Sequence, residues 1–209
     1  MTTEELARAL GGGQRLDELL PGKRLRERVL KEYDAFTGKK KRLATPSPAP
    51  RLLNISGIPG AGKSTLARRI REEEPSLLYL SFDELMESLT PYREDLLEHG
   101  AAEAFKRWEA PARHLGYRFL GECVERRHSL LFEHSNATPG HVALYRHLKS
   151  RGYRVEIRFI DAEPSVALAR ARQRERFLPA GIIAERHALL QALNERYKAI
   201  VDTFETIPT

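Results

Sequence analysis

The stretch NISGIPGAGKST, residues 54–65, decides the fold because it places a glycine-rich loop between an apolar run and a helix-like segment. From Gly57 to Ser64 it matches the pattern G-x-x-x-x-G-K-[ST]. In that pattern the glycines let successive backbone N–H groups surround phosphate oxygens, and the following helix adds its positive end. A glycine-rich turn that binds nothing is the alternative. Lys63 at a helix start argues against it.

We therefore expect the loop to hold the triphosphate of ATP together with Mg²⁺. Lys63 would reach between the β- and γ-phosphates, and the Ser64 hydroxyl would hold the metal ion. The residues expected to bind ATP are Gly57, Pro59, Gly60, Ala61, Gly62, Lys63, Ser64 and Thr65.

Short apolar runs alternate with helical periodicity on either side of this loop. Strands are expected over 51–56, 76–82, 129–133 and 153–160, and helices over 63–74, 101–127 with a break at Pro111, 139–150, 164–177 and 182–204. Such alternation predicts an α/β fold of the three-layer P-loop kinase type, with a parallel sheet of four to five strands. Since the sequence stops at Thr209, where a fifth strand would be expected, either the sheet lacks an edge strand or the chain is cut short.

The chain is expected to divide into an N-terminal helical arm over 1–42 and a kinase-like domain over 43–209. The proline-rich segment TGKKKRLATPSPAP, residues 37–50, is interpreted as the linker between them. Its basic run, Lys39 to Arg42, could contact nucleic acid. A solvated linker is favoured because no aromatic side chains interleave with the lysines.

Composition narrows the class of protein. The chain has 209 residues, a net charge of +6 and a single cysteine, Cys123, which excludes an internal disulfide. The sequence shows neither a secretory signal nor an apolar run long enough to span a membrane, so a cytoplasmic location is expected. No histidine or cysteine spacing is typical of a metal site, which leaves Mg²⁺ as the expected metal.

Two acidic residues close strand-like runs. Asp83 follows the run beginning at Tyr79, and Glu133 follows Leu130 to Phe132. Because ligands of open α/β sheets lie at the carboxyl edge of the strands, Asp83 could accept a proton from an attacking hydroxyl. It could equally cap the next helix. Glu133 could bind Mg²⁺ through water or fix a substrate hydroxyl, or it could simply be a solvated strand end.

Polar and basic side chains follow these strands. Ser135 and Asn136 come after Glu133 and could bind substrate, although they are also ordinary turn residues. An arginine-rich segment over 170–181 reads as a mobile lid, in which Arg172 and Arg176 could stabilise the transferred charge. A solvated helix face is the simpler interpretation for some of its arginines.

These residues resemble the zeta-toxin family of P-loop kinases, which is related to chloramphenicol phosphotransferase and polynucleotide kinases. The loop from Gly57 to Ser64 is similar to that family's G-x-P-G-(A/S)-G-K-(S/T), and Asp83 and Glu133 stand like its strand-end acids. Arg176, in R-F-L-P, stands like the arginine before the lid proline. His134 departs from the family's small turn, and Tyr117 stands near the place of an expected second acid.

The resemblance implies transfer of the ATP γ-phosphate to a hydroxyl of a nucleotide sugar such as UDP-N-acetylglucosamine, or of another small molecule. It also implies restraint by an antitoxin or another inhibitor protein. Two alternatives remain open from the sequence. One is a polynucleotide 5′-hydroxyl kinase, and the other is a nucleotide-gated binding module without phosphotransfer.

Overall fold

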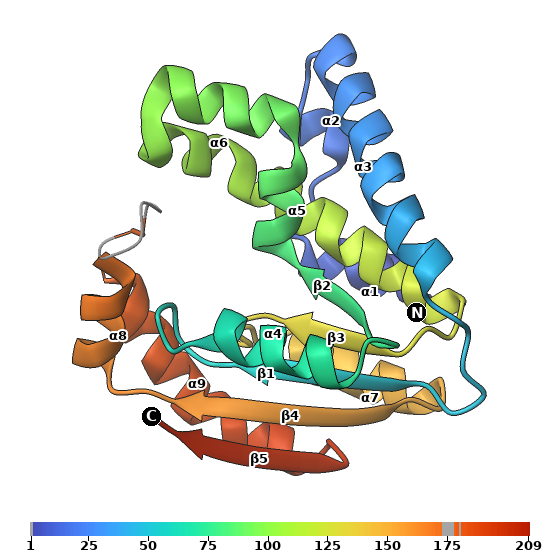
Figure 1. The fold of residues 1–209 in the computed structure, drawn as a ribbon, viewed down its shortest axis with the longest axis vertical. Helices are drawn as coiled ribbons and strands as arrows, with labels where there is room; N and C mark the ends of the chain where they lie inside the picture. Colours follow the sequence, from blue (N-terminus) through green and yellow to red (C-terminus); the bar gives the residue numbers. More distant parts are fainter. Residues whose placement is uncertain (1, 173–177, 180) are drawn as a thin grey trace.

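A computed structural model gives the fold of residues 2–172, 178–179 and 181–209. Within these residues one parallel sheet has the strand order β2-β3-β1-β4-β5 (Figure 1). Its strands are β1 (Arg51–Ser56), β2 (Leu78–Ser81), β3 (Leu130–Glu133), β4 (Arg154–Asp161) and β5 (Thr203–Pro208). The predicted α/β fold with a parallel sheet of four to five strands is confirmed.

Helices cover the sheet and rise above one end of it. They are α1 (Thr3–Leu10), α2 (Leu16–Leu19), α3 (Lys23–Leu43), α4 (Lys63–Glu73), α5 (Phe82–Ser88), α6 (Thr90–Glu125), α7 (His141–Ser150), α8 (Pro164–Arg172) and α9 (Ile182–Lys198). In Figure 1, α4 lies in front of the sheet and α7 and α9 lie behind it, while α3 and α6 stand above β2. The site described below lies at the edge of the sheet, where α5, α6 and α9 meet the glycine-rich loop.

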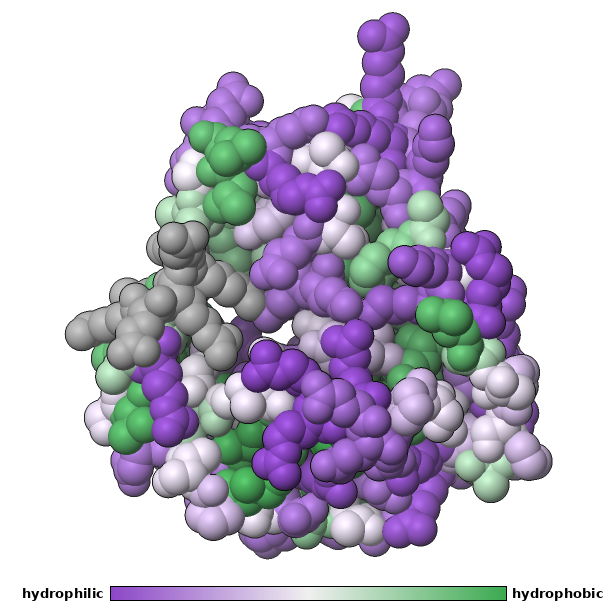
Figure 2. Space-filling view, in the orientation of Figure 1, coloured by the Kyte–Doolittle hydropathy of each residue, from purple (hydrophilic) through white to green (hydrophobic). Residues whose placement is uncertain are grey.

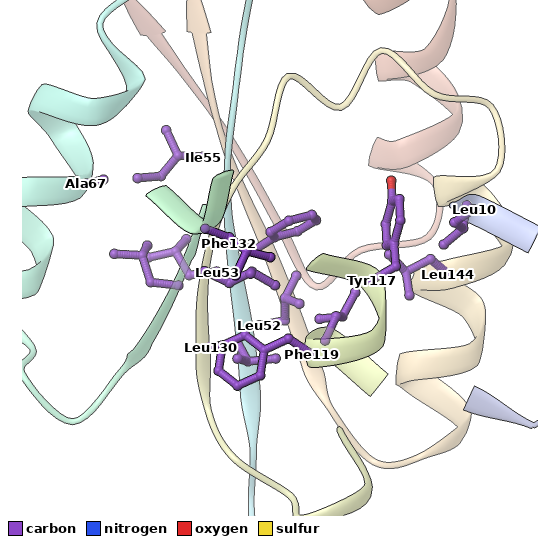
Figure 3. Close-up of a cluster of buried hydrophobic side chains, with 14 of the residues drawn as sticks. Leu10, Leu52, Leu53, Ile55, Ala67, Tyr117, Phe119, Leu130, Phe132 and Leu144 are labelled. Carbon is purple, nitrogen blue, oxygen red and sulfur yellow. The ribbon is translucent and has the colours of Figure 1, made fainter. Parts of the chain in front are cut away.

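The central strands are buried on both faces, as the strands of a parallel sheet covered by helices must be. All but the first residue of β1 is buried. Figure 3 shows Ile55 pointing toward Ala67 of α4, whereas Phe132 lies on the side of Phe119 and Tyr117 from α6. Each fully buried side chain of this size contributes about 1.5–3 kcal/mol to folding. This burial fixes the carboxyl ends of β1 and β3, where the site begins.

The C-terminal segment differs from its sequence prediction. One helix was expected over 182–204, but α9 ends at Lys198, and Phe204 lies on β5 opposite Ile157 of β4. Asp202 marks the turn, because its carboxylate accepts a hydrogen bond from the Val155 N–H at 2.8 Å. The expectation of a sheet short of one edge strand was wrong.

The long helix α6 also differs. A break was expected at Pro111, but the helix continues through that buried proline, and the backbone turns at Gly100 instead (φ +79°). Glycine reaches this left-handed region without steric cost, so it lets α6 fold back as a helical hairpin. Trp108 in the second arm is buried, and its indole N–H donates to Asp95 in the first arm at 2.6 Å. The hairpin places the second arm of α6 over the site.

The N-terminal segment is part of the same core. Val29 and Tyr33 of α3 are fully buried with the side chains of α6. The predicted linker was wrong up to residue 43, because α3 continues through the lysine run. Lys40 pairs with Glu84, and Lys41 pairs with Glu122 at 2.6 Å. These partners remove two of the four cations from the surface expected to be solvated or to contact nucleic acid.

Candidate active site

A cavity of about 490 Å³ lies at the carboxyl edge of the sheet, within the size range of small-molecule sites. Figure 2 shows the surface hollowed between the helices above and the sheet below. The cavity is lined by the glycine-rich loop, by β3 and the loop after it, by helices α1, α5, α6, α8 and α9, and by residues 178–179. The cavity therefore joins segments that are far apart in the sequence.

The glycine-rich loop is shaped to hold phosphate close to its backbone. Gly60 has φ +85°, and a Cβ placed on it would lie 2.1 Å from the Ala167 carbonyl oxygen of α8. Only glycine therefore fits at this position. Lys63 begins α4, and its ammonium donates to the carbonyl oxygens of Gly57 and Ile58 at 3.0 Å each. With the N-terminus of α4 behind it, this loop suits a triphosphate.

Ser64 and Glu133 form a pair beside the loop. The Ser64 hydroxyl donates to Glu133 Oε1 at 2.7 Å, and the Tyr79 hydroxyl donates to the other carboxylate oxygen. Burial raises the pKa of Tyr79, and the neighbouring Glu133 carboxylate raises it further, so the phenol stays a donor. A serine hydroxyl and a carboxylate are hard oxygen donors. With the phosphates of a nucleotide they fit Mg²⁺, which takes few direct protein ligands.

Asp83 lies in the first turn of α5 rather than at the end of a strand. Ser81 caps this helix by accepting a hydrogen bond from the Glu84 N–H, so capping does not explain Asp83. The strands β2 and β1 are not neighbours, because β3 lies between them. Asp83 nevertheless lines the same cavity as Lys63 and Ser64. The start of α5 therefore places Asp83 at the cavity that the glycine-rich loop also lines.

The loop after β3 is held by a buried polar network. The Asn136 side-chain oxygen accepts from the Tyr145 hydroxyl at 2.6 Å and contacts His141, whose other ring nitrogen is 2.7 Å from the Tyr117 hydroxyl. Asn136 is fully buried and does not line the cavity, so the structure gives it a role in shaping the loop rather than in contacting substrate. Ser135 does line the cavity.

The family was assigned by comparing the sequence with models of known protein families. The model for zeta toxin matches residues 34–209. The chain belongs to the zeta toxin family. The matched region contains the cavity-lining residues of α5, α6 and α9, whereas α1, α2 and the first part of α3 precede it. No curated protein matches the chain.

Solved structures share the zeta toxin fold at low sequence identity. A chain from the PezAT chromosomal toxin–antitoxin system of Streptococcus pneumoniae is similar with a TM-score of 0.71 and 19% identity, over 87% of this chain and 77% of that chain. The AvrRxo1-ORF1:AvrRxo1-ORF2 complex with ATP gives a TM-score of 0.67 at 17% identity, over 88% of this chain. The match spans 63% of that chain, less than two thirds of its length.

Half of the predicted lid, residues 173–177 and 180, falls outside the described residues. Arg176 is one of those outside, as is the side chain of Arg172. Leu178 and Pro179, just before α9, line the cavity. In the described part of the chain, no helix is both long and apolar enough to cross a membrane.

Two arginines that sequence reasoning missed line the same cavity: Arg113 on α6 and Arg186 on α9. The Arg186 guanidinium donates to the Ser135 hydroxyl at 2.6 Å. A signal for it existed in the sequence. The buried positions of α9 are Ile183, Leu190, Leu193, Asn194 and Tyr197, and Arg186 interrupts their spacing of three and four residues. A charged residue on a mostly apolar helix face indicates a site.

Proposed function

We propose that this member of the zeta toxin family is an ATP- and Mg²⁺-dependent phosphotransferase that moves the γ-phosphoryl group to a hydroxyl of a small molecule. A nucleotide sugar such as UDP-N-acetylglucosamine is the first candidate acceptor. The observation that carries the proposal is that one cavity is lined by a carboxylate, Asp83, and by the phosphate loop with Lys63 and Ser64.

Each of these residues has its own role in the proposed phosphoryl transfer. Backbone N–H groups of the phosphate loop and the Lys63 ammonium would bind the nucleotide phosphates, while Ser64 and Glu133 would hold Mg²⁺, with Glu133 acting through water. Bound Mg²⁺ would neutralise charge on the phosphates. Asp83 accepts the proton of the attacking hydroxyl. Arg172 and Arg176 stabilise the transferred charge, and Ser135 positions the acceptor.

The proposed reaction is balanced without any further reactant. The acceptor oxygen forms a bond to the γ-phosphorus while the bond from that phosphorus to the ADP oxygen breaks. The hydroxyl proton passes to Asp83, and ADP leaves with the electron pair of the broken bond. Positioning and charge neutralisation supply most of the rate enhancement in such transfers, which is what a rigid loop and a fixed carboxylate provide.

An inhibitor protein is the proposed partner. The similar chain from Streptococcus pneumoniae comes from a system described as toxin–antitoxin. For this chain we infer the same type of control, in which a second protein restrains the kinase. Growth arrest on expression of the chain, relieved by co-expression of the product of an adjacent gene, would support the inference. Normal growth without any second protein would contradict it.

The proposed function is tested by incubating the purified chain with γ-labelled ATP and a panel of acceptors. The panel contains nucleotide sugars, small alcohols and RNA with a 5′-hydroxyl. Label is expected on a small molecule and not on RNA, because Lys40 and Lys41 are engaged by Glu84 and Glu122. Label on no acceptor would favour a nucleotide-gated binding module, and label on RNA would identify a polynucleotide kinase.

A further inference from the structure

We propose that Arg113 and Arg186 form an anion-binding subsite for the acceptor, so that the molecule phosphorylated here carries a phosphate or carboxylate group besides its reacting hydroxyl. The proposal rests on the proposed function, because it names the class of acceptor for that site. It assigns two residues to acceptor recognition that come from different helices and lie 73 positions apart in the sequence.

Arg186 has an unused hydrogen-bond donor. One of its terminal nitrogens donates to the Ser135 hydroxyl at 2.6 Å, but its Nε is buried and has no hydrogen-bond partner among the residues that the structure describes. A buried charged donor without a partner costs about 1–3 kcal/mol or more, so proteins seldom leave one unless a ligand completes it. The guanidinium fork can bind a carboxylate or phosphate through two nitrogens at once. The missing partner of the Arg186 Nε is therefore best supplied by an anion.

Arg113 adds a second positive charge to the subsite. Burial lowers the pKa of Arg186, and the nearby positive charge of Arg113 lowers it further. The acids near Arg186 are Glu109, Glu185 and Asp83, and they act in the opposite direction. Glu109 is the ion-pair partner of Arg113, one helical turn away on α6. An anion shared by the two arginines would relieve their repulsion.

The place of the pair in the cavity favours the acceptor over the nucleotide. The nucleotide phosphates already have their own cation, Lys63, and the Ser64–Glu133 pair for Mg²⁺. Arg113 instead lies on α6, which packs against α1 and α5. The helix that follows the phosphate loop is α4. Phe105 of α6 and Met86 of α5 line the same cavity as Asp83, the proposed base on α5. An acceptor held there would present its hydroxyl to that carboxylate.

The first experiment tests the subsite without requiring turnover. The full chain is saturated with Mg²⁺ and a non-hydrolysable ATP analogue, and inorganic phosphate or acetate is titrated while the NMR signal of the Arg186 Nε–H is followed. A saturable shift with phosphate identifies a phosphate subsite, and one with acetate identifies a carboxylate subsite. The shift is expected to be absent in Arg113→Gln and preserved in Arg196→Gln, a change of an exposed arginine on the same helix. No shift with either anion would overturn the proposal.

The second experiment uses matched acceptors that differ in charge. Initial rates are compared for UDP-N-acetylglucosamine against N-acetylglucosamine, and for gluconate against glucose. Arg186→Gln is expected to raise KM at least tenfold for the anionic acceptor of a pair and to leave kcat nearly unchanged. Arg186→Lys, which keeps the charge but loses the fork, should give an intermediate KM. A loss of kcat at unchanged KM would instead place Arg186 on the transferred phosphoryl group and overturn the proposal.

These experiments distinguish failure of the proposed function from failure of the anion subsite. If no acceptor is labelled, the proposed function fails, while the anion titration still decides whether Arg186 binds an anion. If transfer occurs equally well to charged and neutral acceptors, the proposed function stands and the anion subsite is wrong. Thermal unfolding of each variant, compared with Arg196→Gln, shows whether a lost NMR shift reflects a lost fold.

Discussion

The two ends of the cavity are built in different ways. The nucleotide end comes from one unbroken stretch, residues 54–65, plus Glu133 on the neighbouring strand. The acceptor end is assembled from α1, α5, α6 and α9, which contribute Leu10, Asp83, Arg113 and Arg186. A local loop can be inherited as a unit, whereas an assembled wall can change one side chain at a time. On the proposed function, this difference would allow the acceptor to change while the nucleotide end is kept.

The largest effect is expected from a substitution that disrupts only the nucleotide end of the cavity. Gly60→Ala places a Cβ within 2.1 Å of the Ala167 carbonyl oxygen, so the loop and α8 must separate. We expect nucleotide binding to weaken by about 100-fold or more, comparable to the loss of a preorganised backbone donor in an active site. Binding is measured by isothermal titration with ATP and Mg²⁺.

The matched control for this change is Gly152→Ala. Gly152 has a similar φ of +78°, but its added Cβ would meet only the side chain of Arg127, at 3.9 Å. It should cost about 1–2 kcal/mol of backbone strain and leave nucleotide binding unchanged. Equal nucleotide affinity in the Gly60 variant and the wild type would show that the close contact with α8 does not shape the loop.

A smaller effect is expected at the acceptor end from Leu10→Ala. Leu10 of α1 lines the cavity and packs so closely on α7 that a Cβ on Gly140 would lie 2.5 Å from its Cδ2. Removing it should lower the free energy of unfolding by about 2–3 kcal/mol and raise KM for the acceptor, with nucleotide affinity unchanged. Urea unfolding and initial rates measure these.

The control for Leu10 is Leu97→Ala, because Leu97 is 89% exposed. That change should stay within about 0.5 kcal/mol of the wild type. If Leu10→Ala weakened nucleotide binding as strongly as it weakened acceptor use, the two ends of the cavity would not be separable.

The smallest expected effect concerns pH and the loop that joins the two ends. Burial lowers the pKa of His141 to about 3 from 6.5, and burial also lowers that of His134. The unfolded chain therefore binds more protons than the folded chain between these pH values, so stability is complete above about pH 6.5 and falls as pH drops toward 3. Acidification from pH 7 to 5 should cost on the order of 1–2 kcal/mol through His141 alone.

The measurement is the urea midpoint at several pH values, with NMR titration of the His141 ring as the direct check. His141→Gln should reduce the pH dependence and leave the part that comes from His134, whereas a change of the exposed His99 should leave it as it is. A His141 ring that gains its proton near pH 6.5 would contradict the buried network.

The sequence predicted which residues lie together at the proposed nucleotide end, because its signals are local. The glycine pattern, the apolar run before it and the acid closing β3 all lie within short windows, and the structure brings Lys63, Ser64 and Glu133 together. The predicted parallel sheet was confirmed, and β5 was missed because the helical spacing of α9 was extended through Asp202, whose turn depends on a contact with Val155.

The acceptor end could not be predicted in the same way. Arg186 meets Ser135 across 51 positions, and Leu10 reaches the cavity only because the helices before the family match pack on α6 and α7. Such contacts depend on how whole helices pack, and periodicity in one helix does not specify them. The interruption of the apolar face of α9 by Arg186 was the one sequence signal available for this end.

The most direct test of the account is a comparison of nucleotide binding and phosphoryl transfer in Asp83→Asn. This change keeps the size and polarity of the side chain but removes the base from the cavity wall. Transfer of label to the acceptor is expected to fall by about 10²–10⁴-fold while the Kd for ATP with Mg²⁺ stays within about twofold of the wild type. Transfer at the wild-type rate would contradict the assignment of Asp83 as the base, and with it the proposed use of this cavity for phosphoryl transfer.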